Sequence, residues 1–389
     1  MKITISVGGP FPTPFRLAEF LEREDCLERI VTFMPKFRLK SSLQLALDNS
    51  HLVTFPWLGY LNYVQWRFLK HRVDLPYWIS DTFDRLAAQQ LGTCDLFNGW
   101  CSTALHSIRQ AKAQGAVTVL NTGSAHIAFQ NELMEAEYAK FGQKRTVIDP
   151  RLVEKGAQEF VEADHIIVAS TFVKRTLLER GIERSKISVV PDAPTRHFHT
   201  QPKTDEVFRI IAVGRLEFRK GIQYLLEAVR QLRLPNSELL LVGGLQAEFS
   251  PILKKYAGHY RLAGRVRHEE LGMFYSQSSV LVLPSVEDGW SHVTLEAMSC
   301  GLPAIVSANA GSADAVQDGV NGFVVPACDT QALMEKIEFL YRHPDLCWEM
   351  GQQAQRQVKD RTWESYGHEI CQVFSSVLET KSFQDQAGL

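Results

Sequence analysis

Hydrophobic positions come in short runs rich in β-branched residues, separated by longer stretches with helical spacing. Runs of this kind predict buried strands, and their alternation with helices predicts parallel sheets covered on both faces. In the first half we expect strands at Ile3–Val7, Ile30–Phe33, Leu52–Phe55, Asp95–Phe97, Val117–Leu120, Ile166–Val168 and Ile187–Val190. Helical spacing predicts helices at Pro14–Glu24, Thr103–Gln114, Phe129–Phe141, Arg151–Glu162 and Thr171–Arg180.

The alternation stops at residues 191–206, which hold three prolines and no apolar periodicity and so predict an interdomain linker. Beyond this segment we expect strands at Arg209–Val213, Leu239–Val242, Val280–Leu283, Ala304–Val306 and Gly322–Val325. Helices are expected at Gly221–Leu232, Glu269–Gln277, Thr294–Cys300, Thr330–His343 and Asp345–Arg361.

The predicted fold is therefore α/β, with two Rossmann-like, doubly wound domains of parallel sheet. We place the first domain at residues 1–192 and the second at 206–361, with a C-terminal helix within 362–389 that crosses back onto the first. Two such domains create a cleft between the carboxyl ends of their sheets, and ligands of such sheets bind there.

The composition is that of an ordinary globular protein. Lys and Arg total 42 and Asp and Glu 44, a net charge of −2, which disfavours a polybasic nucleic-acid binder. The seven cysteines never form a Cys-x-x-Cys pair, so we expect neither a disulfide framework nor a zinc site. The N-terminal apolar run is too short for a signal peptide, and no run approaches about 18 uncharged apolar residues, so we expect a cytoplasmic protein.

Residues 210–229 predict a strand, a tight turn and a helix. Gly214 ends the strand, and Arg215, Arg219 and Lys220 follow at the start of the helix. Cations beside the positive end of a helix dipole favour a phosphate or pyrophosphate. The pattern fits neither the Walker loop nor the dinucleotide fingerprint, which disfavours a P-loop NTPase or a dehydrogenase. A solvated basic helix start is the weaker alternative, because these residues follow an apolar strand in the predicted cleft.

A second loop, residues 284–303, combines acidic residues with a glycine and a short helix. Gly289 would let the backbone approach a ligand closely. A carboxylate can accept hydrogen bonds from both hydroxyls of a vicinal diol, so Glu287, Asp288 and Glu296 are candidates for holding sugar hydroxyls. The alternative makes Asp288 a helix cap and Glu296 a surface charge.

Together these segments resemble the donor-site motifs of glycosyltransferase family 4 across essentially all of residues 208–345. The resemblance rests on VGRLEFRKG, LAGRVRHEEL, PSVEDGWSHVTLEAMSCGLPAIVS and AVQDGVNGFVVP, in this order. In the first half, Gly8, Gly9 and residues 121–142 are more loosely similar to the family's glycine loop and histidine segment. The resemblance implies the GT-B fold and the retaining transfer of a hexose from a UDP- or GDP-linked donor to an acceptor hydroxyl.

Matching positions carry the family's roles onto this chain. By this resemblance, Arg215 and Lys220 would bind the diphosphate and neutralise the charge that builds on the leaving group. The loop containing Arg265 and Val266 would hold the base through its backbone. Glu296 would correspond to the ribose-binding carboxylate of the family's E-x₇-E motif.

The first acid of this motif departs from the family pattern. Asp288 stands eight positions before Glu296, so the motif is D-x₇-E, and Gly289, Trp290 and Ser291 replace the usual Gly-Phe-Gly. The shorter Asp would reach the donor hexose differently or through water, and the serine would crowd it. We expect the nucleotide site to be retained and leave the identity of the hexose open.

His126 matches the family's first-domain histidine, which lies near the transferred sugar, and would position that sugar. A lone histidine is more often structural, but Asn121 at a strand end and nearby Ser124 favour the cleft side. The catalytic candidates are His126, Arg215, Lys220 and Asp288. The donor-binding candidates are Gly9, Gly214, Arg215, Lys220, Arg265, Val266, Glu287, Asp288, Gly289, Trp290, Ser291 and Glu296. The chain has no Asp-x-Asp pair, so we expect no metal and no cofactor besides the nucleotide sugar.

Residues 55–78 are dense in aromatic side chains, interleaved with Arg67, Lys70, His71 and Arg72. One interpretation is a lipid-facing or glycan-stacking surface near the acceptor. The interpretation we favour narrowly is an amphipathic core helix, whose apolar face would be formed by Trp57, Leu61, Val64, Phe68 and Leu69. We expect a glycan, glycolipid or small-molecule acceptor, and leave open a peripheral contact with the inner membrane face.

The sequence leaves two alternative functions open. A nucleotide-sugar 2-epimerase on the same architecture would need acidic groups poised to abstract a proton from the donor ring, and the sequence identifies none. A catalytically silent protein that binds a sugar nucleotide is the other alternative, and the altered loop at Asp288 and Ser291 is its best support.

Overall fold

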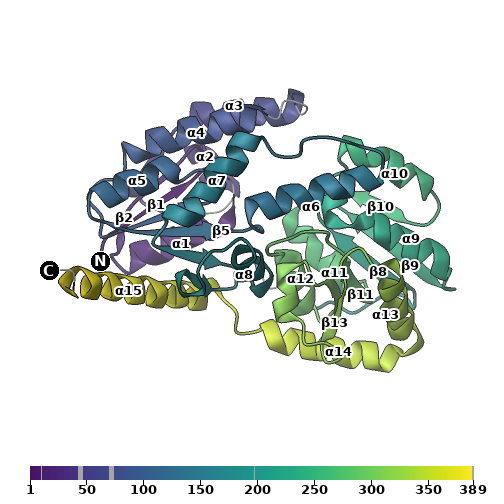
Figure 1. Cartoon of the computed structure of the whole chain (residues 1–389). Helices are drawn as coiled ribbons and strands as arrows, with labels where there is room; N and C mark the ends of the chain where they lie inside the picture. The colour runs from purple at the N-terminus through teal and green to yellow at the C-terminus, as the bar shows by residue number, and fades with distance from the viewer. Residues whose placement is uncertain (10, 43–46, 70–73, 197, 388–389) are drawn as a thin grey trace.

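The computed structural model describes residues 1–9, 11–42, 47–69, 74–196 and 198–387, which form two α/β domains (Figure 1). The first domain contains a parallel sheet of order β3-β2-β1-β4-β5-β6-β7. Its strands are β1 (Ile3–Val7), β2 (Leu27–Thr32), β3 (Leu52–Thr54), β4 (Leu96–Trp100), β5 (Val117–Thr122), β6 (His165–Val168) and β7 (Ile187–Val189). The first-domain helices are α1 (Pro12–Arg23), α2 (Lys36–Ser42), α3 (Pro56–Phe68), α4 (Asp74–Ala88), α5 (Leu105–Ala113), α6 (Ile127–Lys140), α7 (Pro150–Glu162) and α8 (Thr171–Leu178).

The second domain repeats the plan with a parallel sheet of order β10-β9-β8-β11-β12-β13. Its strands are β8 (Phe208–Val213), β9 (Ser237–Val242), β10 (Arg261–Gly264), β11 (Val280–Leu283), β12 (Ala304–Ser307) and β13 (Gly322–Val325). The helices that follow are α9 (Ile222–Leu232), α10 (Ser250–Lys255), α11 (Leu271–Ser276), α12 (His292–Ser299), α13 (Thr330–Arg342), α14 (Pro344–Val358) and α15 (Trp363–Ala387).

The predicted fold class, two doubly wound parallel-sheet domains, is confirmed. Central strands such as β1, β4 and β11 are buried along their whole length, as expected for a parallel sheet covered on both faces. In each sheet the order reverses beside the first strand, between β1 and β4 and between β8 and β11. Ligands of doubly wound sheets bind outside the strand ends at such a point.

The pattern missed one strand, and one interpretation of a helix is wrong. Strand β10, which the pattern did not predict, is an edge strand whose first two residues are exposed, so no buried apolar run marks it. Helix α3 is not the core helix we favoured, because the apolar residues Trp57, Leu61, Val64, Phe68 and Leu69 are exposed. The basic residues predicted at 70–72 lie outside the described residues.

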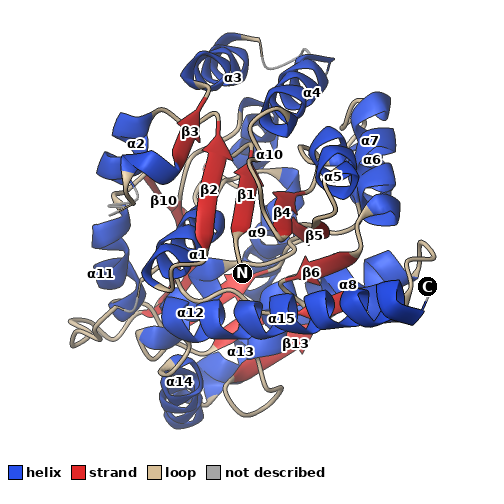
Figure 2. Ribbon diagram, turned by 90° about the vertical axis from the view of Figure 1, so that its left-hand side faces the viewer, coloured by secondary structure: helices blue, strands red, loops and turns tan. Residues whose placement is uncertain are grey.

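The last helix, α15, leaves the second domain and packs against α1 of the first, as Figure 2 shows. Its Tyr366, Ile370 and Phe374 are buried in the same core cluster as Ile3 and Ile5 of β1. The two domains are therefore connected by two separate chain segments.

Helix α6 also belongs to both domains. Its first residue, Ile127, is buried in the core of the first domain, whereas Met134 and Tyr138 are buried in the core of the second. The Tyr138 ring lies 5.0 Å from the ring of Phe218. This helix holds the carboxyl ends of the two sheets close together.

Candidate active site

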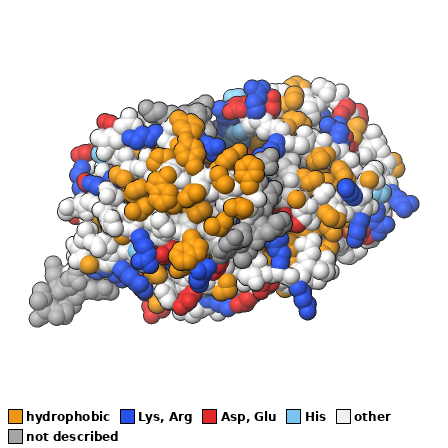
Figure 3. Space-filling model, turned by 90° about the horizontal axis from the view of Figure 1, so that it is seen from above, with side chains coloured by type: hydrophobic (Ala, Val, Ile, Leu, Met, Phe, Trp, Pro, Cys, Tyr) orange, Lys and Arg blue, Asp and Glu red, His pale blue; other side chains and the backbone are white. Residues whose placement is uncertain are grey.

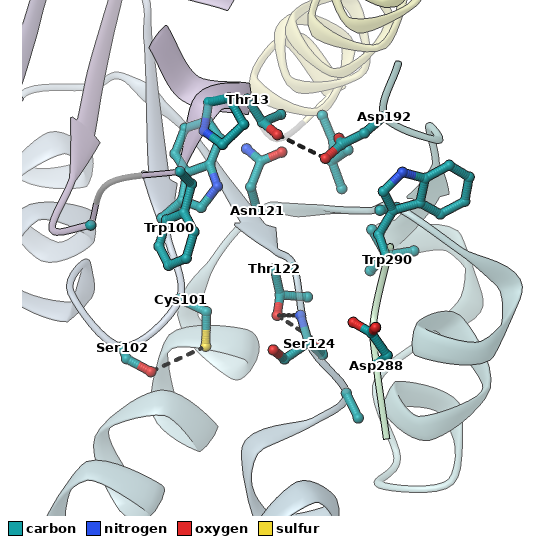
Figure 4. A pocket seen from close by; sticks show the side chains of 18 of the residues that line it. Thr13, Trp100, Cys101, Ser102, Asn121, Thr122, Ser124, Asp192, Asp288 and Trp290 are labelled. Carbon is teal, nitrogen blue, oxygen red and sulfur yellow. Dashed lines mark hydrogen bonds between the residues drawn. The ribbon is translucent and has the colours of Figure 1, made fainter. Parts of the chain in front are cut away.

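A cavity of about 560 Å³ lies where the carboxyl ends of the two sheets meet (Figure 4). The first domain lines it with residues that follow β1, β4, β5, β6 and β7, and the second with the turn before α9 and the loop after β11. Its volume is within the range of small-molecule sites, about 300–1,000 Å³. The cavity thus occupies the place where both sheets are suited to bind a ligand.

The first domain's share of the polar wall is largely neutral. Gly9 follows β1, and Asn121, Thr122 and Ser124 come from the end of β5 and the loop after it. The Thr122 hydroxyl donates to the Ser124 carbonyl at 2.9 Å, which fixes the turn of this loop. Amide and hydroxyl groups such as these match the hydroxyls of an uncharged ligand.

The second domain places two cations beside the cavity through a close backbone contact. A short 3-10 helix, Phe218–Lys220, ends on Gly221, whose φ of 66° suits glycine. A Cβ on Gly221 would lie 1.9 Å from the Pro284 carbonyl oxygen, so only glycine lets the turn after β8 touch the loop after β11. This contact brings Arg219 and Lys220 next to the acidic residues that follow Pro284.

Both cations are paired with these acids. The Lys220 Nζ donates to the carboxylate of Asp288, and the Arg219 Nε donates to Glu287 Oε2 at 2.6 Å. Although burial works against its charge, the carboxylates of Glu287 and Asp288 raise the pKa of Arg219. Arg219 and Asp288 line the cavity, so a charged ligand there would meet a balanced cluster of two cations and two anions.

Glu287 joins the two domains. Its carboxylate is fully buried and accepts hydrogen bonds from the Ala125 amide at 3.0 Å and the Gln130 side chain at 2.8 Å, both in the first domain, besides that from Arg219. A carboxylate with three protein donors has little capacity left for a ligand. We predicted that Glu287 would contact a sugar. Its carboxylate instead binds Arg219 and two groups of the first domain, which only an acceptor at this position can do.

Gly289 completes the contact between the domains, and Trp290 and Ser291 follow it. A Cβ on Gly289 would lie 2.4 Å from the Gly123 carbonyl oxygen, and the Ser170 hydroxyl donates to the Gly289 carbonyl at 2.9 Å. The side chain of Trp290 lines the cavity, and among the described residues its buried indole N–H has no acceptor. Ser291, also buried, precedes α12.

Several predicted donor residues lie outside the cavity lining. Arg215, whose side chain is 52% exposed, pairs with Glu217 at 3.3 Å. Glu296 is buried, with Oε1 held by His268 Nε2 at 2.9 Å and Oε2 by the hydroxyl of Tyr275 at 3.1 Å. The hydrogen bond to Glu296 raises the pKa of His268. In this structure a ribose would need to replace His268 before it could reach Glu296.

The remaining donor candidates flank the end of β8. Gly214 adopts a φ of 139° at the end of the strand, and its carbonyl lies so close to Gly243 that a Cβ there would be 1.7 Å away. Arg265 packs over Gly244, and Val266 is partly buried against the second domain's core. Of the predicted second-domain residues, Asp288 and Trp290 line the cavity. Lys220 and Glu287 lie just behind the lining, paired with Asp288 and Arg219, and the others lie further away.

His126 does not face the cavity, contrary to the prediction. Its imidazole caps α6, where Nδ1 accepts a hydrogen bond from the Ala128 amide at 3.2 Å, and its ring lies 5.0 Å from that of Phe160. Burial lowers the pKa of His126 to about 4, so the ring is neutral at pH 7. The loop after β5 presents Ser124 to the cavity and turns the neighbouring histidine into the first domain's interior.

The structure adds functional candidates that the sequence did not suggest. Asp192 and His292 line the cavity with 3.5 Å between Oδ2 and Nε2, and the Thr13 hydroxyl donates to Asp192 at 2.7 Å. Burial raises the pKa of Asp192. Tyr366, from the helix that crosses back, also lines the cavity. The 100 positions between Asp192 and His292 hide this pair from any local motif.

Comparison with known proteins shows what the second domain is similar to. Residues 195–357 match the family model described as "Glycosyl transferases group 1". An uncharacterised glycosyltransferase of Methanocaldococcus jannaschii is 29% identical over 52% of this chain and 56% of its own length. The D-inositol 3-phosphate glycosyltransferase of Paenarthrobacter aurescens is 25% identical over 56% of this chain and 58% of its own. The chain thus spans a little over half the length of these two curated relatives.

Solved structures share the fold over nearly the whole chain. Sucrose-phosphate synthase from Thermosynechococcus elongatus has a TM-score of 0.71 and 18% identity, covering 98% of this chain and 100% of that one. HepE of Anabaena, solved in complex with UDP, has a TM-score of 0.69 and 16% identity, covering 97% and 100%. These similarities show the fold of the whole chain, and the family match shows that its second domain is similar to group 1 glycosyl transferases.

Proposed function

We propose that the protein is a retaining glycosyltransferase of family 4 that moves a hexose from a UDP- or GDP-sugar to an acceptor hydroxyl. The observation that carries the proposal is the cluster of Arg219, Lys220 and Asp288 at the cavity, inside the segment that matches group 1 glycosyl transferases. HepE, which shares the fold, was solved with UDP and with UDP-glucose, which makes UDP the first donor nucleotide to test.

In the proposed donor site, a diphosphate would replace a carboxylate as the partner of Lys220. Lys220 would leave Asp288 for a phosphate oxygen, and Arg219 would hold the neighbouring oxygens while it keeps its bond to Glu287. Fixed cations aimed at the leaving diphosphate stabilise the charge that grows in the transition state, which is usually the largest contribution to catalysis. The freed Asp288 and the unpaired indole N–H of Trp290 would then contact the donor hexose.

The acceptor would approach from the neutral wall of the first domain. In the transfer step the bond between the sugar C1 and the diphosphate oxygen breaks while the acceptor oxygen bonds to C1 on the same face. The acceptor's proton passes to the released diphosphate oxygen, so the step needs no histidine at the reacting centre. Asn121 and Ser124 would orient the acceptor or the hexose through hydrogen bonds. We propose that Arg and Lys meet the phosphate charge without a metal ion.

A donor panel tests this proposal. The purified full chain is incubated with UDP-, GDP- and ADP-sugars, and NMR follows the release of free sugar and the configuration at its anomeric carbon. Slow hydrolysis or transfer with retention is the expected result. Isomerisation of the ring at C2 would instead identify an epimerase, and calorimetric binding without any turnover would identify a silent binding protein.

A further inference from the structure

Helix α3 exposes a continuous row of large apolar side chains. Trp57, Tyr60, Leu61, Val64 and Phe68 recur at helical spacing, and we call them the α3 aromatic face. Trp57 is 50%, Tyr60 55% and Phe68 69% exposed, whereas Leu58 on the opposite side is 1% exposed. Large contiguous apolar patches are rare on soluble monomers and mark sites of interaction.

The buried side of α3 is narrow, so its exposed face is not needed for the core. Leu58 packs with Phe33, Ile79 and Phe83 in a small cluster. Gly59 lies so close to the Phe33 carbonyl oxygen that a Cβ there would be 2.5 Å away, which shows how tightly this one side is seated. Seen from above, the apolar side chains gather on this face of the first domain (Figure 3).

Positive charge accompanies the aromatic face. The sequences of α2 and α3, KFRLKSS and PWLGYLNYVQWRF, contain Lys and Arg but no Asp or Glu. Lys36 and Arg38 are exposed, and the Arg38 guanidinium lies 5.5 Å from the centre of the Tyr63 ring, which places α2 beside α3. Phe37, between the two basic residues, is exposed as well.

We propose that the α3 aromatic face, with Lys36 and Arg38, docks this protein onto an anionic phospholipid bilayer. Trp and Tyr side chains prefer the membrane interface, and a helix with one apolar face and basic residues beside it lies in that interface. Basic residues next to the inserted helix gain attraction to anionic headgroups. The described part of the chain has no helix long and apolar enough to cross a bilayer, so docking would be peripheral.

Docking would set the cavity beside the lipid headgroups. Asn62, on α3 itself, and the exposed Phe11 both line the cavity, so the patch and the cavity share a border. An acceptor carried on a lipid could therefore reach the cavity from the bilayer. This last step rests on the proposed glycosyltransferase function, whereas the docking itself does not.

Vesicle sedimentation with the full-length chain tests the docking. The vesicles are phosphatidylcholine alone or phosphatidylcholine with about 30% phosphatidylglycerol. We expect the wild type to sediment with the anionic vesicles and the triple variant W57S/L61S/F68S to bind them at least about tenfold more weakly. The variant K36E/R38E should lose the preference for anionic over neutral vesicles, and added salt should weaken wild-type binding in the same way.

The matched control is W348S, which removes an equally exposed aromatic residue from α14 in the second domain. It should bind vesicles as the wild type does, and all variants should keep the wild-type thermal unfolding midpoint because the changed side chains are exposed. Failure of the wild type to bind either vesicle, or an equal loss in W348S, would overturn the proposal. So would a dimer that dissociates in the triple variant, because a second copy would then cover the face. These readouts do not depend on transfer activity, so the docking and the proposed function can fail separately.

Discussion

The two domains share one plan of sheet and helices but carry different chemistry at their strand ends. The first domain offers the cavity mostly neutral groups, such as Asn121, Thr122 and Ser124. The second offers Arg219 and Asp288, and Lys220 lies behind them, bound to Asp288. The fold places a ligand between the sheets, and the loops decide which part of the ligand each side can hold. In the proposed function, a charged diphosphate would lie against the second domain and uncharged sugar hydroxyls against the first.

Where the two domains meet, both cations of the charged cluster are already paired with carboxylates. Lys220 is paired with Asp288, and Arg219 with Glu287, which also binds the first domain. A diphosphate would therefore exchange with a carboxylate rather than enter an unneutralised pocket. This arrangement keeps buried charge balanced in the empty protein, where an unpaired ion would be costly.

From the difference between the two domains, we expect the largest loss of activity for a change in the charged cluster of the second domain. Lys220→Ala should lower kcat/KM by about 2–4 kcal/mol, or roughly 30- to 1,000-fold, because it removes a cation from the leaving diphosphate. Steady-state kinetics with the best donor of the panel measure this effect. Lys254→Ala, an exposed lysine on α10, is the control and should be neutral. Wild-type kinetics in the Lys220 variant would remove this residue from the site.

A large loss of stability is expected when Glu287, which joins the two domains, is changed. Glu287→Gln should lower the free energy of unfolding by about 3 kcal/mol, because Arg219 would lose its buried carboxylate partner. Denaturant unfolding followed by fluorescence measures this value. Glu338→Gln breaks the exposed pair with Arg342 on α13 and should cost less than about 1 kcal/mol. Equal stabilities of the two variants would show that Glu287 does not hold the domains together.

A smaller effect, on stability alone, is expected on the neutral side at His126. His126→Ala should lower the free energy of unfolding by about 1–2 kcal/mol, since α6 loses its cap and Phe160 loses a packing partner. Donor affinity and kcat should stay near the wild type, because the ring faces away from the cavity. His126→Asn keeps an acceptor for the helix amides and should recover part of the stability. A selective loss of kcat in both variants would return His126 to the reacting centre.

The sequence predicted the fold well because buried strands leave a strong local signal. The run at β11 is apolar throughout and those at β1 and β8 are mostly apolar, whereas the partly exposed edge strand β10 leaves no such run. For α3, the spacing predicted that one face of the helix is apolar. It could not tell whether this face packs against the core or is exposed to solvent, because the periodicity is the same in both cases.

The structure brings predicted residues together where a motif and the sheet topology act together. Lys220 and Asp288 follow neighbouring strands, β8 and β11, so the topology brings them together. His126 was misplaced because the turn of this loop brings Ser124, Ala125 and Ile127 to the cavity but leaves His126 outside its lining. Asp192 and His292 meet only through tertiary packing, which no local pattern records.

The smallest predicted effect concerns the second carboxylate of the D-x₇-E motif, Glu296, and its partner His268. The hydrogen bond to Glu296 raises the pKa of His268 above 6.5, so it strengthens the folded state fully below about pH 6.5, and this contribution is lost as pH rises through the raised pKa. In the proposed donor complex, a ribose would displace this imidazole from Glu296. Nucleotide affinity should therefore rise by about 3- to 10-fold as His268 loses its proton.

Calorimetric titration with UDP and GDP between pH 6 and 8.5 measures this dependence, and His268→Gln is the matched variant. The phosphate of the nucleotide has its own pKa of about 6, so some dependence on pH should persist in the variant. The difference between the wild type and the variant in the slope of affinity against pH gives the contribution of the His268 imidazole. If both proteins gave the same slope, His268 would not compete with the ribose, and Glu296 would then be a structural partner of Tyr275 rather than part of the charged side of the site.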